Sequence, residues 1–223
     1  MIADYVNWLE HGAVTGVKHD LATCSSSWAQ AAVAALEGNH FLKTGSMVNL
    51  STQQIIDCDH NSWGCHGGLY TNAFAYATEN PIETAADYPY VGLPQACKAD
   101  KKKGKVSAAN FINVLPQDPD QLKVAVKLGP VAASITTSSK VFQFYKGGII
   151  STEDCSNSIT PLDSAVTIIG YGHDPHLGLD YWPVKHSGGT TWGDPGPGSG
   201  PSRQAGSPGI CNIQAEASIV FAQ

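Results

Sequence analysis

The sequence predicts an α+β protein in which a mainly helical first half is followed by a strand-rich second half. Apolar residues recur at helical spacing before residue 110, whereas later runs are rich in the β-branched and aromatic residues typical of strands. The chain of 223 residues is 42% hydrophobic, which is enough to bury a sizeable core. We therefore expect a helical domain over residues 1–110 and a β-rich domain over residues 111–223.

Three helices are expected in the first half, over residues 27–44, 51–58 and 70–79. The first has apolar residues at helical spacing and ends at Thr44-Gly45, a pair typical of helix termination. Ser51 is placed to cap the second helix, with Gln54 at the capping-box position.

Four strand-like runs are expected in the second half, over residues 131–136, 141–150, 165–171 and 181–185. A segment rich in proline and glycine then follows Trp192-Gly193 at residues 194–202. Proline cannot donate to a β-ladder and glycine weakens one, so this segment is predicted to be an irregular loop.

Charge and composition exclude several classes of function. Thirteen Lys and Arg residues against nineteen Asp and Glu residues give a formal net charge of −6, which argues against nucleic acid as a partner. No apolar stretch is long enough to cross a bilayer, so we expect no membrane insertion. The cysteines form no close Cys-x-x-Cys pair, and the segment 173–176, with two histidines, is expected to be a surface turn. Neither a metal nor another cofactor is expected.

A series of short motifs is spread in order over nearly the whole chain: Val6-Asn7-Trp8, Cys24-Ser25-Ser26-Ser27-Trp28-Ala29, Leu50-Ser51-Thr52-Gln53-Gln54, Gly64-Cys65-His66-Gly67-Gly68, Gly129-Pro130-Val131, Ile169-Gly170-Tyr171-Gly172 and Trp192-Gly193. Together these motifs resemble the papain-like (cathepsin L-like) cysteine peptidases. The resemblance implies a papain-like fold, with a mainly helical left domain, a β-barrel-like right domain and a cleft between them.

The six cysteines allow many pairings, and their number alone does not choose among them. The family resemblance implies the pairs Cys24–Cys65, Cys58–Cys97 and Cys155–Cys211. Three disulfides would be maintained in an oxidising compartment, which predicts a secreted, extracellular or lysosomal and vesicular protein. The sequon Asn49-Leu50-Ser51 fits this route, although a three-residue pattern is weak and Ser51 fits a helix cap better.

The positions that carry the chemistry of the family hold other residues here. The resemblance places Ser27 at the nucleophile, where the family has cysteine, and Ser164 at the base, where the family has histidine. A serine hydroxyl has no proton affinity near neutral pH, so Ser164 cannot act as a general base. His186 occupies the position of the orienting asparagine, and Gly188 that of the shielding tryptophan.

The glutamine of the oxyanion hole is also missing from the aligned segment. The loop before Cys24 is one residue longer than in the family, so Leu21 falls at this position when counted back from Cys24 and Asp20 when counted forward from Lys18. Neither residue supplies the neutral amide donor that stabilises an oxyanion.

The walls of the expected cleft are better kept than its chemistry. The resemblance places Gly67 and Gly68 where relatives hold an extended peptide through backbone hydrogen bonds, and it assigns Leu162, Asp163 and Trp192 to substrate binding. On the residues alone, the two glycines are as well explained by a turn beside a disulfide.

The leading interpretation is a catalytically inactive homologue, or pseudoenzyme, with a binding, structural or storage role and with a peptide or protein ligand in its cleft. One alternative is a serine-type hydrolase in which His186 leans towards Ser27, with Asp163 or Asp20 as the orienting group. Another is a self-assembling protein similar to the silicateins, which also carry serine for cysteine.

Overall fold

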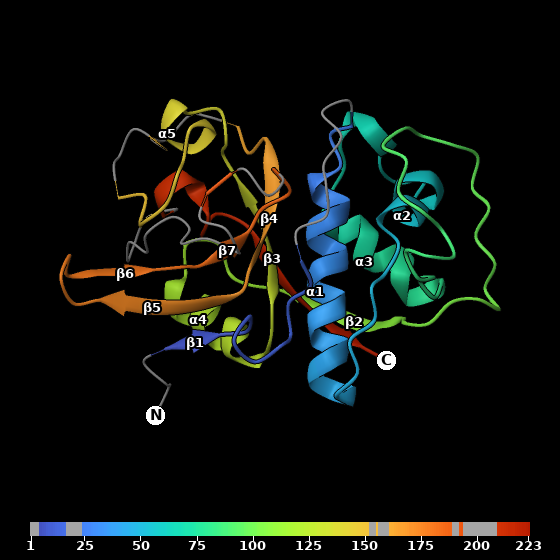
Figure 1. Cartoon of the computed structure of the whole chain (residues 1–223), viewed down its shortest axis with the longest axis horizontal. Coiled ribbons are helices and arrows are strands. Elements are labelled where there is room, and N and C mark those ends of the chain that lie inside the picture. The colour runs from blue at the N-terminus through green and yellow to red at the C-terminus, as the bar shows by residue number, and fades with distance from the viewer. Residues whose placement is uncertain (1–4, 17–23, 152–154, 156–160, 189–191, 194–208) are drawn as a thin grey trace.

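The computed structural model describes residues 5–16, 24–151, 155, 161–188, 192–193 and 209–223 (Figure 1). In Figure 1 the helices α2 and α3 lie on one side of the long helix α1, and α4, α5 and most of the strands lie on the other. The α+β class is confirmed. Up to Glu79 the elements are β1 (Val6–Asn7), α1 (Ser27–Thr44), α2 (Thr52–Cys58), the 3₁₀ helix η1 (Gly64–His66) and α3 (Tyr70–Glu79).

The three predicted helices are confirmed with nearly the expected bounds. Gly45 ends α1 in the left-handed conformation, with φ of 73°, and its N–H donates to the Phe41 carbonyl. The Ser51 side chain caps α2 by accepting from the Gln54 N–H over 3.0 Å. The second half of a capping box is not formed, because the Gln54 side chain instead accepts from the Glu83 N–H.

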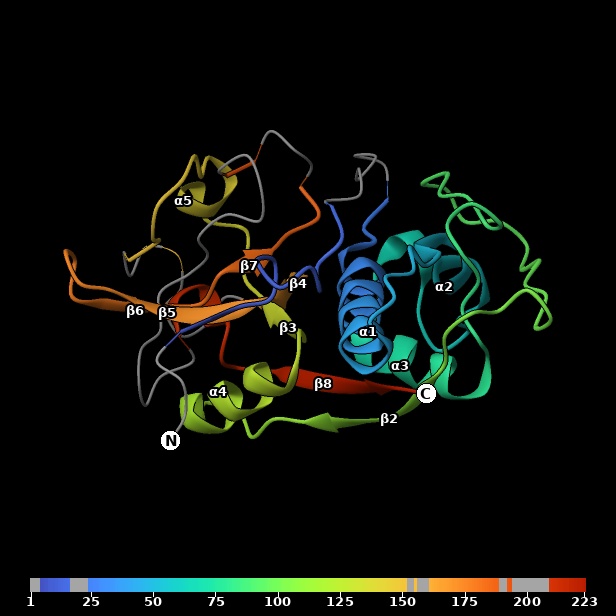
Figure 2. The same cartoon turned by 60° about the horizontal axis from the view of Figure 1, so that its bottom comes forward.

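The strands form two antiparallel sheets. A five-stranded sheet has the order β2-β8-β3-β4-β7, and a three-stranded sheet has the order β1-β5-β6. Figure 2 shows β2 and β8 running beneath the base of α1 from one half towards the other. After Glu79 the elements are β2 (Ala108–Asn113), α4 (Pro119–Leu128), β3 (Val131–Ile135), α5 (Lys140–Gln143), β4 (Ser164–Ile168), β5 (Gly170–Asp174), β6 (Leu179–Tyr181), β7 (Val184–Lys185), η3 (Ile210–Asn212) and β8 (Ala217–Ala222).

The strand expected over residues 141–150 is wrong. This segment instead contains the short helix α5, whose first turn is capped by the Ser139 side chain accepting from the Phe142 N–H over 3.2 Å. Phe142 and Tyr145 are both buried, and their spacing of three residues suits a helical turn rather than the alternation of a strand.

Two other expected strands are each divided in two. The run over 165–171 breaks at Ile169, where the chain passes from β4 in the larger sheet to β5 in the smaller one. The run over 181–185 breaks between β6 and β7, where Pro183 lies. The proline- and glycine-rich segment 194–202 lies outside the described residues.

The apolar core of the described residues has two parts. One cluster contains residues of α1, α2 and α3, with Ala108, Val220 and Ala222 from the ends of β2 and β8. The other packs between the sheets and α4 around the fully buried Trp182. In α1 every residue from Trp28 to Asn39 is buried, so the helix is enclosed on all sides along this stretch.

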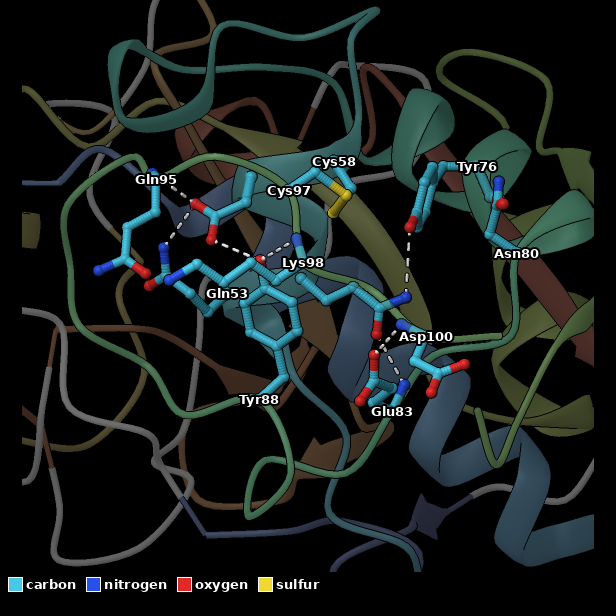
Figure 3. The surroundings of a disulfide bond; sticks show 12 residues. Gln53, Cys58, Tyr76, Asn80, Glu83, Tyr88, Gln95, Cys97, Lys98 and Asp100 are labelled. Carbon is cyan, nitrogen blue, oxygen red and sulfur yellow. Dashed lines mark hydrogen bonds between the residues drawn. A yellow bond between two sulfur atoms is a disulfide. The ribbon is translucent and has the colours of Figure 1, made fainter. Parts of the chain in front are cut away.

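All three predicted disulfides are present: Cys24–Cys65, Cys58–Cys97 and Cys155–Cys211. Figure 3 shows Cys58–Cys97, which joins α2 to the loop after Tyr88. The same loop is bound to α2 by the Tyr88 hydroxyl and the Gln95 N–H, each of which donates to the carboxylate of Asp57 over 2.8 Å. Of the helices in the described part of the chain, none has the length and apolar character needed to cross a membrane.

Candidate functional site

A cleft of about 480 Å³ lies between the start of α1 and the segment that leads into β4. This volume is in the range of pockets that hold small molecules or peptide segments. The described residues that line it come from both halves of the chain: Ser25, Ser27, Trp28, Trp63, His66, Gly67, Gly68, Leu69, Tyr70, Ser134, Leu162, Asp163, Ser164, Ala165 and Glu216. The structure thus places six of the residues expected at the site around one cleft: Ser27, Ser164, Gly67, Gly68, Leu162 and Asp163.

Ser27 is the first residue of α1 and faces the start of β4. Its hydroxyl oxygen accepts a hydrogen bond from the Ala165 N–H over 3.2 Å. This position is set by the disulfide Cys24–Cys65 and by the Ser25 N–H, which donates to the Cys65 carbonyl. The Ser27 hydroxyl is thus fixed at the cleft floor by a contact from the opposite half of the molecule.

Asp163 and Ser164 stand opposite Ser27 at the start of β4. Asp163 is fixed by its Oδ1 atom, which accepts from the N–H of Thr137 over 2.7 Å and from the Thr137 hydroxyl over 2.9 Å. Among the described residues, Asp163 makes no hydrogen bond with His186, so it does not act as the orienting group, which was one of the two candidates in the hydrolase alternative. Asp20 and Leu21 lie outside the described residues.

His186 follows β7 and lies in an aromatic environment. Its ring centroid is 4.6 Å from that of Trp192 and 5.1 Å from that of Phe142, and the Trp192 indole N–H donates to the Phe142 carbonyl over 2.7 Å. Burial lowers the pKa of His186 to about 4, so the ring is neutral at physiological pH.

The tautomer of His186 follows from its backbone partner. The Gly188 N–H donates to Nδ1 of His186 over 3.1 Å, so Nδ1 carries the lone pair and the ring proton is on Nε2. Within the described residues no hydrogen bond joins His186 to Ser27. Both residues do line a small cavity of about 10 Å³ beside α1, which is close to the space needed for a single water molecule.

Gly67 and Gly68 are required by the local structure. Gly67 has φ of 110° and follows η1, in a turn where the Trp63 N–H donates to the Gly67 carbonyl over 2.9 Å. A Cβ atom at Gly68 would lie 2.7 Å from the ring of Trp28. The turn interpretation is sufficient to explain both glycines, and their contact with a peptide stays a prediction.

Trp192 was assigned to substrate binding, and this role also stays a prediction. In the structure its ring packs on Tyr145, Phe142 and His186, and it does not line the described part of the cleft.

A buried polar network beside the site was missed in the sequence analysis. Lys185 Nζ donates to the Thr15 hydroxyl over 2.8 Å, and that hydroxyl donates to Oε2 of the fully buried Glu37 over 2.7 Å. The network joins α1 to β7 immediately before His186 and so fixes the base of the site. A glutamate inside an otherwise alanine-rich apolar helix was the available signal, because a buried carboxylate needs a partner.

Within the described residues, no three His, Cys, Asp or Glu side chains are grouped in a way that could hold a metal ion. The two histidines of the segment 173–176 lie on the β5–β6 hairpin, where His173 contacts Asp180 over 2.8 Å.

Comparison with known proteins places the chain in a family. The model of the "Papain family cysteine protease" matches residues 2–221. Cathepsin L of Sarcophaga peregrina is 43% identical over 195 residues, which are 86% of this chain and 56% of that protein. Cysteine protease Amb a 11.0101 of Ambrosia artemisiifolia is 42% identical over 196 residues, 87% of this chain and 49% of that protein. The chain thus spans about half the length of these curated relatives.

Solved structures agree with this assignment. The proform of the ragweed pollen protease Amb a 11 has a TM-score of 0.90 and 38% identity, covering 99% of this chain and 66% of that chain. The bromelain protease from Ananas comosus, in complex with the E64 inhibitor, has a TM-score of 0.90 and 31% identity, covering 99% of both chains. The papain-like fold is confirmed, and the chain belongs to the papain family of cysteine proteases.

Proposed function

We propose that this chain is a non-catalytic member of the papain family that binds peptide segments in its cleft without cleaving them. We place it in an oxidising compartment, secreted or lysosomal, because its three disulfides fit such an environment.

The observation that carries the proposal is the state of the cysteines. All six are joined in disulfides, so none remains as a thiol. Cysteine proteases attack the substrate with a thiolate. A sulfur atom in a disulfide cannot ionise to a thiolate, so none of these cysteines can act as the nucleophile. The residue at the start of α1 that faces the cleft is Ser27, whose hydroxyl depends on a base to remove its proton.

The groups around Ser27 support the absence of such a base. Ser164, on the opposite wall, carries only a hydroxyl, which cannot act as a general base. The imidazole of His186 is neutral, but its lone pair at Nδ1 is occupied by the Gly188 N–H. A pKa of about 4 also makes the ring a weak proton acceptor. Neither residue is equipped to take a proton from Ser27.

Binding without cleavage is supported by the cleft. The cleft has a volume of about 480 Å³, and its lining combines the exposed side chains of Trp63 and Leu69 with the hydroxyls of Ser25 and Ser164. Such a lining can hold an extended chain through apolar contacts and hydrogen bonds.

Two measurements on the non-reduced protein test the proposal, with the Ananas bromelain protease as the positive control. We expect no hydrolysis of fluorogenic peptides and no covalent labelling by E64, whereas a library of uncleaved peptides should yield ligands that are retained in equilibrium binding. Peptide turnover that is abolished by Ser27→Ala would overturn the non-catalytic assignment. A cleft that retains no peptide would overturn the binding role.

A second candidate is a serine-type hydrolase, which is favoured by the small cavity shared by Ser27 and His186. A water molecule in this space could relay a proton between the two residues. Labelling with a fluorophosphonate distinguishes the candidates: the hydrolase requires labelling that both Ser27→Ala and His186→Ala abolish, and the binding protein predicts none.

A further inference from the structure

We propose that Asn49 carries an N-linked glycan, and that the glycan is attached before α2 packs against the segment of residues 83–88. The residues Asn49-Leu50-Ser51 form the acceptor pattern for such a modification. The inference rests on passage through an oxidising secretory compartment, and it is independent of whether the cleft binds or cleaves peptides.

Hydrogen bonding sets the Asn49 side chain apart from the rest of the sequon. The Asn49 carbonyl accepts from the Ala85 N–H over 2.8 Å, and the Leu50 N–H donates to Oε1 of Glu37 over 2.7 Å. The Ser51 N–H donates to the Glu83 carbonyl over 2.8 Å. The Asn49 side-chain amide, by contrast, is exposed and makes no hydrogen bond with any described residue. A sugar on this nitrogen would therefore displace no hydrogen bond made among the described residues.

The hydroxyl of Ser51 is in the opposite situation. Ser51 is 1% exposed, and its hydroxyl accepts from the Gln54 N–H over 3.0 Å and donates to the Tyr88 carbonyl over 2.7 Å. The acceptor pattern requires this hydroxyl, so the enzyme that reads the pattern must reach it. In the folded protein it is enclosed and both of its hydrogen-bonding functions are used. Transfer therefore has to precede the formation of the α2 cap.

The transfer uses one co-reactant, a lipid-linked oligosaccharide pyrophosphate, which donates the sugar. Nδ2 of Asn49 forms a bond to the anomeric carbon of the first sugar and loses one proton. The bond between that carbon and the pyrophosphate oxygen breaks, and the lipid pyrophosphate leaves with the electron pair.

The position of Asn49 keeps the glycan away from the cleft. Asn49 lies in the segment that follows α1, and its neighbour Leu50 is bonded through its N–H to Glu37, which is ten residues along the helix from Ser27. No described residue that lines the cleft comes from residues 45–51. The modified protein would thus keep its cleft open.

Expression in a secretory eukaryotic cell tests the modification. We expect a mass increase that is removed by a glycosidase specific for N-glycans, which leaves aspartate at position 49. Asn49→Gln should abolish the increase completely without loss of folding, because the exposed Asn49 side chain makes no hydrogen bond with any described residue. Ser51→Thr is the matched control, since it keeps both the pattern and a capping hydroxyl and should retain the glycan. An unmodified wild-type chain secreted from cells that glycosylate a reference protein would overturn the proposal.

The order of events has its own test with an oligosaccharyltransferase preparation and a lipid-linked oligosaccharide. We expect the reduced and unfolded chain to be modified at Asn49 and the folded, disulfide-bonded chain to remain unmodified. Equal modification of the two forms would overturn the claim that transfer precedes the folding of α2.

Discussion

The backbone N–H of Gly188 donates to Nδ1 of His186 over 3.1 Å, and a Cβ atom at position 188 would lie 2.8 Å from that same nitrogen. The imidazole of His186 can therefore occupy this position only because residue 188 is a glycine. The ring also packs against both Phe142 and Trp192, which restricts its movement.

The first prediction follows from this dependence. Gly188→Ala should lower the free energy of unfolding by about 1–3 kcal/mol, because the new methyl group overlaps the imidazole. In a His186→Asn background the loss should be smaller, with a coupling of about 0.5–3 kcal/mol in a double-mutant cycle measured by chemical denaturation. Gly16→Ala serves as the control, since a Cβ atom there meets nothing within 4 Å. Additive effects of Gly188→Ala and His186→Asn on the free energy of unfolding would contradict the prediction.

The second prediction concerns stability against pH. Burial lowers the pKa of His186 from its ordinary value of 6.5 to about 4 in the folded protein. Between these values the unfolded chain binds a proton that the folded protein does not, so the free energy of unfolding falls as the pH drops from about 6.5 towards 4, by up to about 3 kcal/mol. His186→Asn should remove this part of the pH dependence when denaturation curves are compared across the window.

The third prediction concerns the restoration of activity. Ser27→Cys alone should not create a peptidase, because the new thiol would have no imidazole partner and would remain mostly protonated. The triple variant Ser27→Cys, Ser164→His and His186→Asn should show weak turnover of a fluorogenic peptide. If Ser27→Cys alone gives activity that His186→Ala then abolishes, the imidazole reaches the cleft after all and the non-catalytic proposal fails.

The fourth prediction concerns graded reduction of the disulfides. Cys97 is exposed, whereas both sulfur-bearing residues of each of the other two disulfides are buried, so Cys58–Cys97 should open first. The protein should stay folded at that stage, because Asp57 still binds the loop through Tyr88 and Gln95. Later opening of Cys155–Cys211, which closes the longest of the three loops at a separation of 56 residues, should cost about 4 kcal/mol. Alkylation followed by peptide mass mapping, with thermal unfolding at each stage, measures the order; simultaneous opening of all three would refute it.

The sequence predicted the helices well because their ends carry local signals. Ser51 caps α2 with its own side chain, and Gly45 ends α1 in a conformation that glycine favours. The same kind of signal marks α4, where the Asp118 side chain accepts from the Gln121 N–H and Pro119 opens the helix, although this element was not predicted. It could have been found from the residues alone.

The strands were predicted less well because pairing between distant segments decides them. The apolar run through Ile169 reads as one strand, but its two parts pair with different sheets. The strands β2 and β8 are defined by their mutual register over Ala108–Asn113 and Ala217–Ala222, more than a hundred residues apart. The local sequence of either strand does not indicate which distant segment it pairs with.

Some features of the candidate site could likewise be predicted from the sequence, whereas others depend on the folded structure. The disulfide pairs and the grouping of Ser27 with Ser164 and Asp163 around one cleft follow from motif order and the family resemblance. The tautomer of His186 does not, since it depends on a backbone N–H that the chain places beside Nδ1 only after folding. The network of Thr15, Glu37 and Lys185 joins three distant segments and has no contiguous motif.

The enclosure of α1 has a consequence for how this molecule can be made. The helix contacts α2 and α3 on one side and β3, β4 and β8 on the other, and its residues from Trp28 to Asn39 are covered by both groups. A fragment that ended near residue 110 would leave much of this apolar surface bare, since the strands that cover it come later in the chain. The two halves are therefore joined in a single folding event, and neither should be obtainable as a stable product without the other.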